Sequence, residues 1–133
     1  MNSNFEIGNI KYQIAIPLLI WGAINMIAGI FYFFSTSELI KGVFLQAFFW
    51  GLIDGIIGIV PLFRKKEFAL EKIKKIFLVN TYLDVVYIVI GLLLILLGAN
   101  LFIIGNGYGV VIQGLFLLII DFIHYTHIKK LLK

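Results

Sequence analysis

The sequence predicts an all-α fold: an integral membrane four-helix bundle with short loops and both termini on the cytoplasmic side. Three observations predict it. Hydrophobic residues make up 62% of the chain, against roughly 45–50% in soluble proteins. They fall into four long apolar stretches, and the basic residues lie almost entirely on one side of those stretches. A soluble fold of 133 residues could not hide so much apolar surface from water.

Each apolar stretch is long enough to cross a bilayer as a helix, which takes about 20 residues. The predicted spans cover about residues 14–34, 42–63, 76–98 and 109–128 of one transmembrane domain, residues 1–133. The connections are short, and the last one, residues 99–107, is rich in glycine. Residues 105–109 superficially resemble a potassium-channel filter, but the segment is too short to carry a pore helix. A flexible outer turn is therefore expected there.

The basic residues indicate the orientation of the spans, because Lys and Arg are enriched in cytoplasmic loops. Of the 11 basic residues, only Lys41 lies on the side opposite to the termini. Both termini are therefore expected in the cytoplasm, in a multi-pass protein of the cell membrane, and of the bacterial inner membrane in particular. The other basic residues precede the first predicted span, separate the second from the third, or follow the fourth: Lys11; Arg64, Lys65, Lys66, Lys72, Lys74 and Lys75; Lys129, Lys130 and Lys133.

A ten-residue segment occurs twice in the first half of the chain. Residues 21–30 (WGAINMIAGI) recur as residues 50–59 (WGLIDGIIGI), with six of ten positions identical and Asn25 matched by Asp54. Consecutive spans run in opposite directions, so the two copies would be inverted relative to each other. Inverted repeats occur in membrane transporters, which favours a duplication. The competing interpretation is chance or a shared packing motif, since tryptophan, glycine and isoleucine are common in spans.

Helical spacing gathers the polar and small residues of each span on one face. These faces are expected to meet inside the bundle, with glycines permitting close helix approach and the aliphatic faces contacting lipid. The three aspartates each lie about 12–15 Å along their helices from the next basic residue on the cytoplasmic side, so their carboxyl groups are expected at one level. The candidate intramembrane polar cluster comprises Asp54, Asp84, Asp121, Asn25, Asn80, Tyr87 and His124.

A carboxyl group near the centre of a span costs about 2.5–3.5 kcal/mol on insertion scales, so such groups usually have a role. No Lys or Arg lies within a predicted span to pair with the aspartates. They are therefore expected to be protonated, to hydrogen-bond with neighbours such as Asn80 and Tyr87, or to be neutralised by a bound cation. The competing interpretation is that carboxyl and amide groups only join helices, at roughly 0.6–2 kcal/mol per bond.

His124 lies one helical turn after Asp121, where it could share a proton with that carboxyl group. The competing interpretation is a solvated histidine at the membrane interface. The chain has no cysteine and no second histidine well placed for a metal site, so neither a metal nor a cofactor is expected. Since no motif for nucleophilic catalysis occurs, an enzyme is not predicted.

The expected partner is the lipid bilayer. The basic segment at residues 64–75 also carries Phe68, Leu70 and Ile73, which suits a short amphipathic helix lying on anionic lipid headgroups. The net charge of +4 does not indicate nucleic acid, because the basic residues flank apolar stretches and form no stripe. A homo-oligomer is compatible with the sequence.

Three segments resemble a group of small, uncharacterised bacterial four-span membrane proteins. They are WGxIN at residues 21–25, NTYLDVVY at residues 80–87 with Gly91 after it, and QGLFLLIIDFIH at residues 113–124. The resemblance covers most of the chain and implies a shared fold and a common reason for the polar positions. It implies no activity, because none is assigned to that group.

Two functions follow from the residues. The favoured one is a structural or accessory membrane subunit whose polar residues form a helix-packing core. The alternative is a small proton- or cation-coupled transporter that uses the intramembrane carboxyl cluster. A carrier needs a hydrated pathway and exchange between conformations, so accessibility of Asp84 to water would distinguish the second function from the first.

Overall fold

The computed structural model describes residues 3–63 and 69–133. These residues form four long helices and no strand: α1 (Ser3–Ile30), α2 (Glu38–Phe63), α3 (Leu70–Leu97) and α4 (Leu101–Leu131). A short 3-10 helix, η1 (Phe31–Phe34), extends α1. All four helices are long and apolar enough to cross a membrane. The predicted all-α class with four span-length helices is therefore confirmed.

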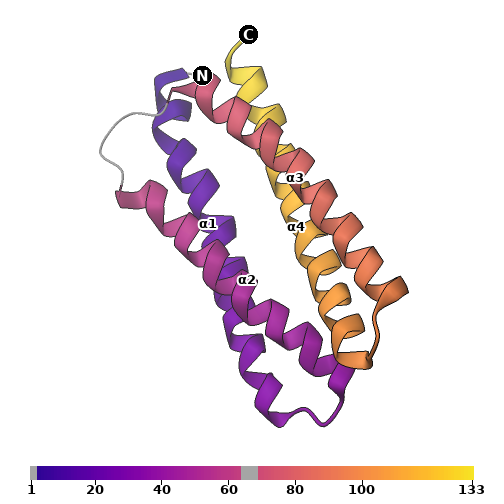
Figure 1. Ribbon diagram of the computed structural model, residues 1–133. Helices are drawn as coiled ribbons and strands as arrows, with labels where there is room; N and C mark the ends of the chain where they lie inside the picture. Colours follow the sequence, from indigo (N-terminus) through magenta and orange to yellow (C-terminus); the bar gives the residue numbers. More distant parts are fainter. Residues whose placement is uncertain (1–2, 64–68) are drawn as a thin grey trace.

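The helices pair into two hairpins, α1 with α2 and α3 with α4, and the hairpins meet mainly along α2 and α4 (Figure 1). Within the described residues, the backbones of α2 and α3 do not come close to each other. Both chain ends, the end of α2 and the start of α3 lie at one end of the bundle, called here the terminal end (Figure 1). The α1–α2 and α3–α4 turns lie at the other, called the turn end.

Side-chain caps set the helix starts at the turn end. Asn100 precedes α4, and its side-chain oxygen accepts a hydrogen bond from the backbone N–H of Ile103 at 3.0 Å. Such a cap satisfies one of the free donors of a helix N-terminus. Ser37 Oγ accepts from the N–H of Ile40 at 3.4 Å and does the same for α2. Only three residues separate Phe34 from α2, and three separate α3 from α4, so both hairpin turns are short.

The glycine-rich segment expected to form an outer turn lies inside α4, so that prediction is wrong. The helix begins at Leu101, whereas the predicted fourth span begins near residue 109. Glycine costs a helix about 1 kcal/mol relative to alanine, which favours a turn on local grounds. Here the glycines serve tertiary contacts instead. A Cβ on Gly105 would overlap the carbonyl oxygen of Leu39 in α2, and Gly107 and Gly109 pack closely on α3 and α2.

In each hairpin, a glycine of one helix faces a glycine of the other at short distance. A Cβ on Gly22 would lie 2.8 Å from the Gly51 carbonyl oxygen, and one on Gly51 would lie 2.7 Å from the Gly22 oxygen. Gly91 and Gly107 meet in the same reciprocal way, at 2.9 and 2.8 Å. Backbone atoms cannot rotate away, so these helices approach this closely only because the residues have no side chain. The first contact also joins equivalent positions of the two repeat copies, residues 21–30 and 50–59.

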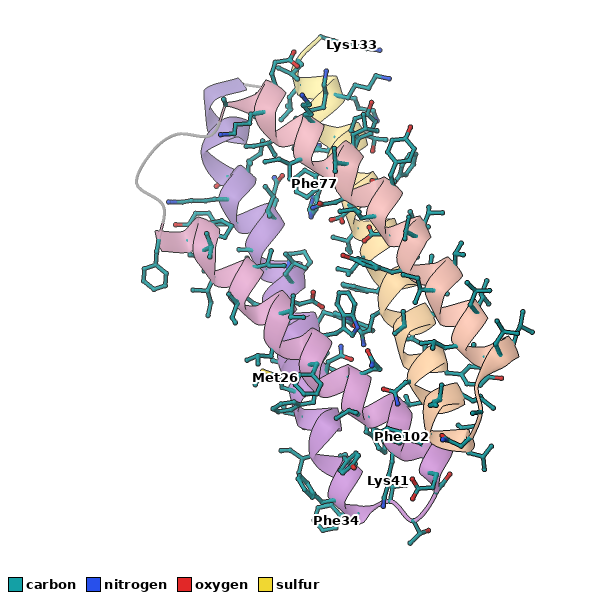
Figure 2. The ribbon with its side chains drawn as sticks, viewed as in Figure 1. Met26, Phe34, Lys41, Phe77, Phe102 and Lys133 are labelled. Carbon is teal, nitrogen blue, oxygen red and sulfur yellow. The ribbon has the colours of Figure 1, made fainter. Side chains whose placement is uncertain are left out.

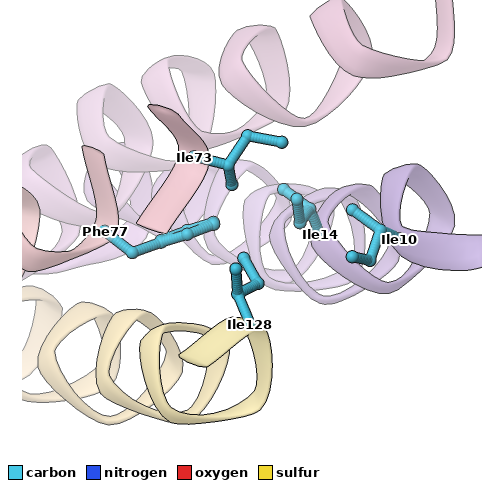
Figure 3. Packing of buried hydrophobic residues seen from close by; sticks show 5 residues of the cluster. All are labelled: Ile10, Ile14, Ile73, Phe77 and Ile128. Carbon is cyan, nitrogen blue, oxygen red and sulfur yellow. The ribbon is translucent and has the colours of Figure 1, made fainter. Parts of the chain in front are cut away.

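Apolar side chains project outward from all four helices (Figure 2). Phe33 and Leu96, for example, are 83% and 77% exposed. Apolar burial is concentrated at the terminal end, where one cluster joins α1, α3 and α4 (Figure 3). The cluster comprises Ile10, Ile14, Ile73, Phe77 and Ile128.

The amphipathic helix expected over residues 64–75 is only partly within the described structure. Residues 64–68 lie outside the described residues. Leu70 to Lys75 form the first turns of α3, and Ile73 packs into the apolar cluster of the terminal end. This part therefore continues into the long helix and contributes to the bundle, because its apolar side chain has a buried partner surface.

Candidate functional site

The polar residues inside the bundle form two layers, of buried and partly buried side chains. The amide layer, nearer the turn end, consists of Trp21, Asn25, Gln46, Trp50, Asn106 and Gln113. The carboxyl layer, nearer the terminal end, consists of Asp54, Asp84 and Asp121. Along α4, Gln113 and Asp121 are eight residues apart, which separates the two layers by about 12 Å.

The first part of the amide layer joins α1 to α4. Trp21 Nε1 donates to Gln113 Oε1 at 2.8 Å, and Gln113 Nε2 donates to Asn25 Oδ1 at 2.7 Å. Asn25 Nδ2 in turn donates to the Trp21 carbonyl at 2.8 Å. The Trp21 ring stacks on Phe116 with 4.0 Å between ring centroids. Gln113 is only 2% exposed, and its amide oxygen and nitrogen both have partners, as a buried amide requires.

The second part joins α2 to α4, closer to the turn end. Trp50 Nε1 donates to Gln46 Oε1 at 3.0 Å, and Gln46 Nε2 donates to Asn106 Oδ1 at 2.8 Å. Asn106 Nδ2 donates to the Phe102 carbonyl at 2.8 Å. Tyr87 of α3 packs edge-on against the Trp50 ring, with 5.2 Å between centroids. Each hydrogen-bond chain thus links one tryptophan of the repeat to α4.

The carboxyl layer brings together one aspartate from each of three helices. Asp54, Asp84 and Asp121 are 1%, 2% and 7% exposed. Asp84 and Asp121 lie within hydrogen-bonding reach of each other, and Asp54 is close enough to both to interact electrostatically. An ionised carboxylate can only accept, so a bond between Asp84 and Asp121 requires a proton on one of the two groups. Within the described residues, Oδ2 of Asp54 and Oδ2 of Asp84 have no hydrogen-bond partner.

No basic side chain balances these acids. The two salt bridges found in the described part of the chain, Lys41–Glu38 and Lys74–Glu71, each join neighbours on the outside of one helix. Residues 42–63 and 76–128, which include all three aspartates, contain no Lys or Arg. Among the described residues, no group of three acidic, His or Cys side chains is arranged to hold a metal ion. Protons or a bound cation could neutralise the layer.

A cavity of about 190 Å³ borders the carboxyl layer on the side of the terminal end. All four helices contribute to its lining, and its polar lining residues are Asn80 and Asp121. It lies where the backbones of α2 and α3 do not come close to each other. Asn80 and Asp121 both line this cavity. None of the hydrogen bonds found among the described residues joins Asn80 to Asp84. Apolar residues complete the lining: Ile14, Leu18, Ile57, Pro61, Ile73, Ile76, Phe77 and Leu117.

His124 is buried, contrary to the interpretation as a solvated interfacial histidine. It is 9% exposed, and its ring packs against Phe77 with 5.1 Å between centroids. No hydrogen bond found among the described residues joins it to Asp121, and its Nε2 has no partner there. The Nε2 atom of His127 is buried and without a partner in the same sense. The apolar cluster of the terminal end covers this face of α4, which sequence spacing alone does not reveal.

Sequence reasoning does not identify the amide layer as a site. Its central residue, Gln113, shares a face of α4 with Asn106, seven residues earlier, and this spacing is the signal that would have identified both. Because the sequence predicts an outer turn over residues 105–109, it does not place Asn106 on a helix face. The partner of Asn25 is accordingly an amide, and the partner of Tyr87 is a tryptophan. The aspartates pair with each other.

The comparisons with known proteins add one family. The sequence model of DUF6992, a family of unknown function, matches residues 17–122. This range contains every candidate site residue except His124. No curated protein and no solved structure matches the chain.

Proposed function

Because the chain belongs to DUF6992, a family of unknown function, we propose a function from its own residues. The protein is a multi-pass membrane protein that binds and releases protons at the carboxyl layer and works as a small proton-coupled carrier. The observation that carries this proposal is the buried Asp84–Asp121 pair, whose carboxyl groups lie within hydrogen-bonding reach and need a proton between them to form such a bond.

Membrane insertion is supported by the distribution of polarity in the bundle. Large apolar side chains are exposed along all four helices, while the buried side chains include three acids, two amides and a histidine. Water would favour the opposite arrangement, and hydrocarbon favours this one. Both termini lie at the same end (Figure 1), as an even number of crossings requires. The excess of basic residues at that end supports a cytoplasmic location for it.

Proton exchange is supported by the incomplete bonding of the carboxyl layer. A buried charge without a partner is strongly unfavourable, and the layer has no basic partner. Protons are therefore the simplest neutralising species. The unpartnered Oδ2 atoms of Asp54 and Asp84 leave room for a second proton-bound arrangement, and the cavity beside Asp121 provides a place for a ligand that replaces a proton.

A second function, that of a structural or accessory subunit, is supported by the amide layer. Its hydrogen bonds are complete within the described residues, and glycine contacts hold the helices at close distance. This function explains Gln113 and Gln46 well. It offers no reason for carboxyl oxygens that are buried without partners.

Substitution of Asp84 tests the proposal. Asp84→Asn keeps the size of the side chain and can still donate a hydrogen bond to Asp121, but it cannot titrate. Asp84→Leu can neither form a hydrogen bond nor titrate. Infrared difference spectra of the protein in lipid nanodiscs, taken between acidic and alkaline pH, report protonated carboxyl groups through their carbonyl stretch. We expect the wild type to show a buried carboxyl band that responds to external pH. Asp84→Asn should lose that response while unfolding at the wild-type temperature.

The two functions give different results in this experiment. If the aspartates only join helices, Asp84→Leu is destabilised, and the wild-type carboxyl band does not change with external pH. Either an unresponsive band in the wild type or an unchanged response in Asp84→Asn would contradict the proton-binding function. The thermal unfolding of each variant shows whether a lost band reflects lost titration or lost structure.

A further inference from the structure

We propose that the cavity beside Asp121 binds a monovalent organic cation whose apolar body is about the size of one aromatic ring. The ligand enters between α2 and α3. This inference rests on the proposed function, because the cation would neutralise the same carboxyl layer that otherwise holds a proton.

The volume of the cavity sets the size of the ligand. An apolar protein cavity of about 150 Å³ binds benzene, and this one has about 190 Å³. One ring or a short branched group therefore fits. A larger apolar group could extend through the opening, since Ile57 and Ile76 in the cavity lining are 51% and 48% exposed.

The lining sets the charge of the ligand. Most of the wall is aliphatic, which suits an apolar body, while Asp121 and Asn80 provide oxygen atoms at one place. Asp84 and Asp54 are close enough to Asp121 to add to the negative potential at this place. The ring of Phe77 adds an aromatic wall, which attracts cations as well as apolar groups. A lipid acyl chain would fill the aliphatic part but would offer no polar or charged group to Asp121 and Asn80.

The route of entry follows from the helix arrangement. Because the backbones of α2 and α3 do not come close to each other in the described residues, and half-exposed Ile57 and Ile76 line the cavity from these two helices, the cavity opens sideways between the hairpins. In a bilayer, this opening faces lipid in the half nearer the terminal end. An amphiphilic cation that has partitioned into the membrane can therefore reach Asp121 without crossing the amide layer. Charge balance then requires one proton to leave the carboxyl layer for each cation bound.

Benzyltrimethylammonium is a suitable probe, because its charge is permanent and it has an uncharged carbon isostere, neopentylbenzene. Binding to the protein is measured by saturation-transfer NMR and calorimetry in nanodiscs of zwitterionic lipid. We expect the cation to bind the wild type and to bind Asp121→Asn at least tenfold more weakly. The neutral isostere should bind the wild type at least tenfold more weakly than the cation does.

A variant at the cavity rim tests the location independently of the acid. Ile76→Trp places a large side chain in the opening, and it should fold normally because Ile76 is half-exposed. It should abolish binding of the cation. The matched control is Ile90→Trp, on the same helix and 45% exposed but outside the cavity lining, and it should bind like the wild type.

Three results would overturn the inference: equal binding of cation and isostere, unchanged binding in both Asp121→Asn and Ile76→Trp, or no binding at all. Equal binding would mean that the cavity accepts any hydrocarbon, including a lipid chain. None of these results depends on the infrared response of Asp84. A failed ligand site with an intact proton response would therefore be distinguished from failure of the proposed function itself.

Discussion

Gln113 and Asp84 are both polar, almost fully buried residues in the centre of the bundle, yet their bonding differs. Gln113 has a partner for each end of its amide group. Asp84 has another acid, Asp121, as its neighbour and has one oxygen without a hydrogen-bond partner in the described residues. Because an unpaired buried polar group is unfavourable, the first residue contributes to stability, and the second is better explained by binding.

At the residue scale, Gln113→Leu is expected to destabilise the bundle. The change removes two interhelical hydrogen bonds worth roughly 0.6–1.7 kcal/mol each, so a loss of about 1–3 kcal/mol in the free energy of unfolding is expected. Reversible unfolding in mixed detergent micelles, followed by tryptophan fluorescence, measures it. The control is Gln13→Leu, at an exposed position of α1, which should leave stability unchanged. Wild-type stability in Gln113→Leu would contradict a packing role for the amide layer.

At the scale of elements, glycine determines how closely the helices of a hairpin approach. Gly51 and Gly55 lie one turn apart on α2, but only Gly51 faces backbone at short distance. Around Gly55, an added Cβ would meet nothing within 4 Å. Alanine substitutions at these two positions therefore distinguish the effect of helix propensity from the effect of contact between α1 and α2.

Gly51→Ala should destabilise the first hairpin, because its methyl group would lie 2.7 Å from the Gly22 carbonyl oxygen, and overpacking costs typically about 1–3 kcal/mol. Gly55→Ala should be neutral or stabilising by up to about 1 kcal/mol, since alanine is the better helix former. Thermal unfolding of the two purified variants gives the comparison directly. If both variants behaved alike, the close Gly22–Gly51 contact would not be the position that limits helix approach.

At the scale of the whole molecule, two hairpins with both termini at one end form an even-numbered bundle. Each hairpin is closed by its own glycine contact, and α4 joins them through the amide layer and its packing on α2. The cavity lies between α2 and α3, where the backbones of the two hairpins are not in close contact. The ligand site therefore exists only when the two hairpins are assembled.

The orientation of the molecule is tested by chemical labelling, which is simple because the chain has no cysteine. Single cysteines at Thr36 and Ala99, both exposed and in the two turns, should react with a membrane-impermeant maleimide on intact cells. A cysteine at Lys133 should react only after the cells are permeabilised. Reaction at position 133 alone would reverse the orientation. Asn106 is unsuitable as a probe, since it lies in α4 and is hydrogen-bonded to Gln46.

The sequence by itself determined the number and class of the helices, because apolar runs and helical periodicity are properties of each segment alone. The same periodicity indicates that Asp54, Asp84 and Asp121 share the polar faces of their helices. Only the tertiary structure decided that Asp84 pairs with Asp121, that Asn25 pairs with Gln113, and that residues 105–109 are helical. These outcomes depend on the rotation and offset of one helix against another, which contacts between distant residues such as Gly91 and Gly107 determine and which no pattern within a single helix contains.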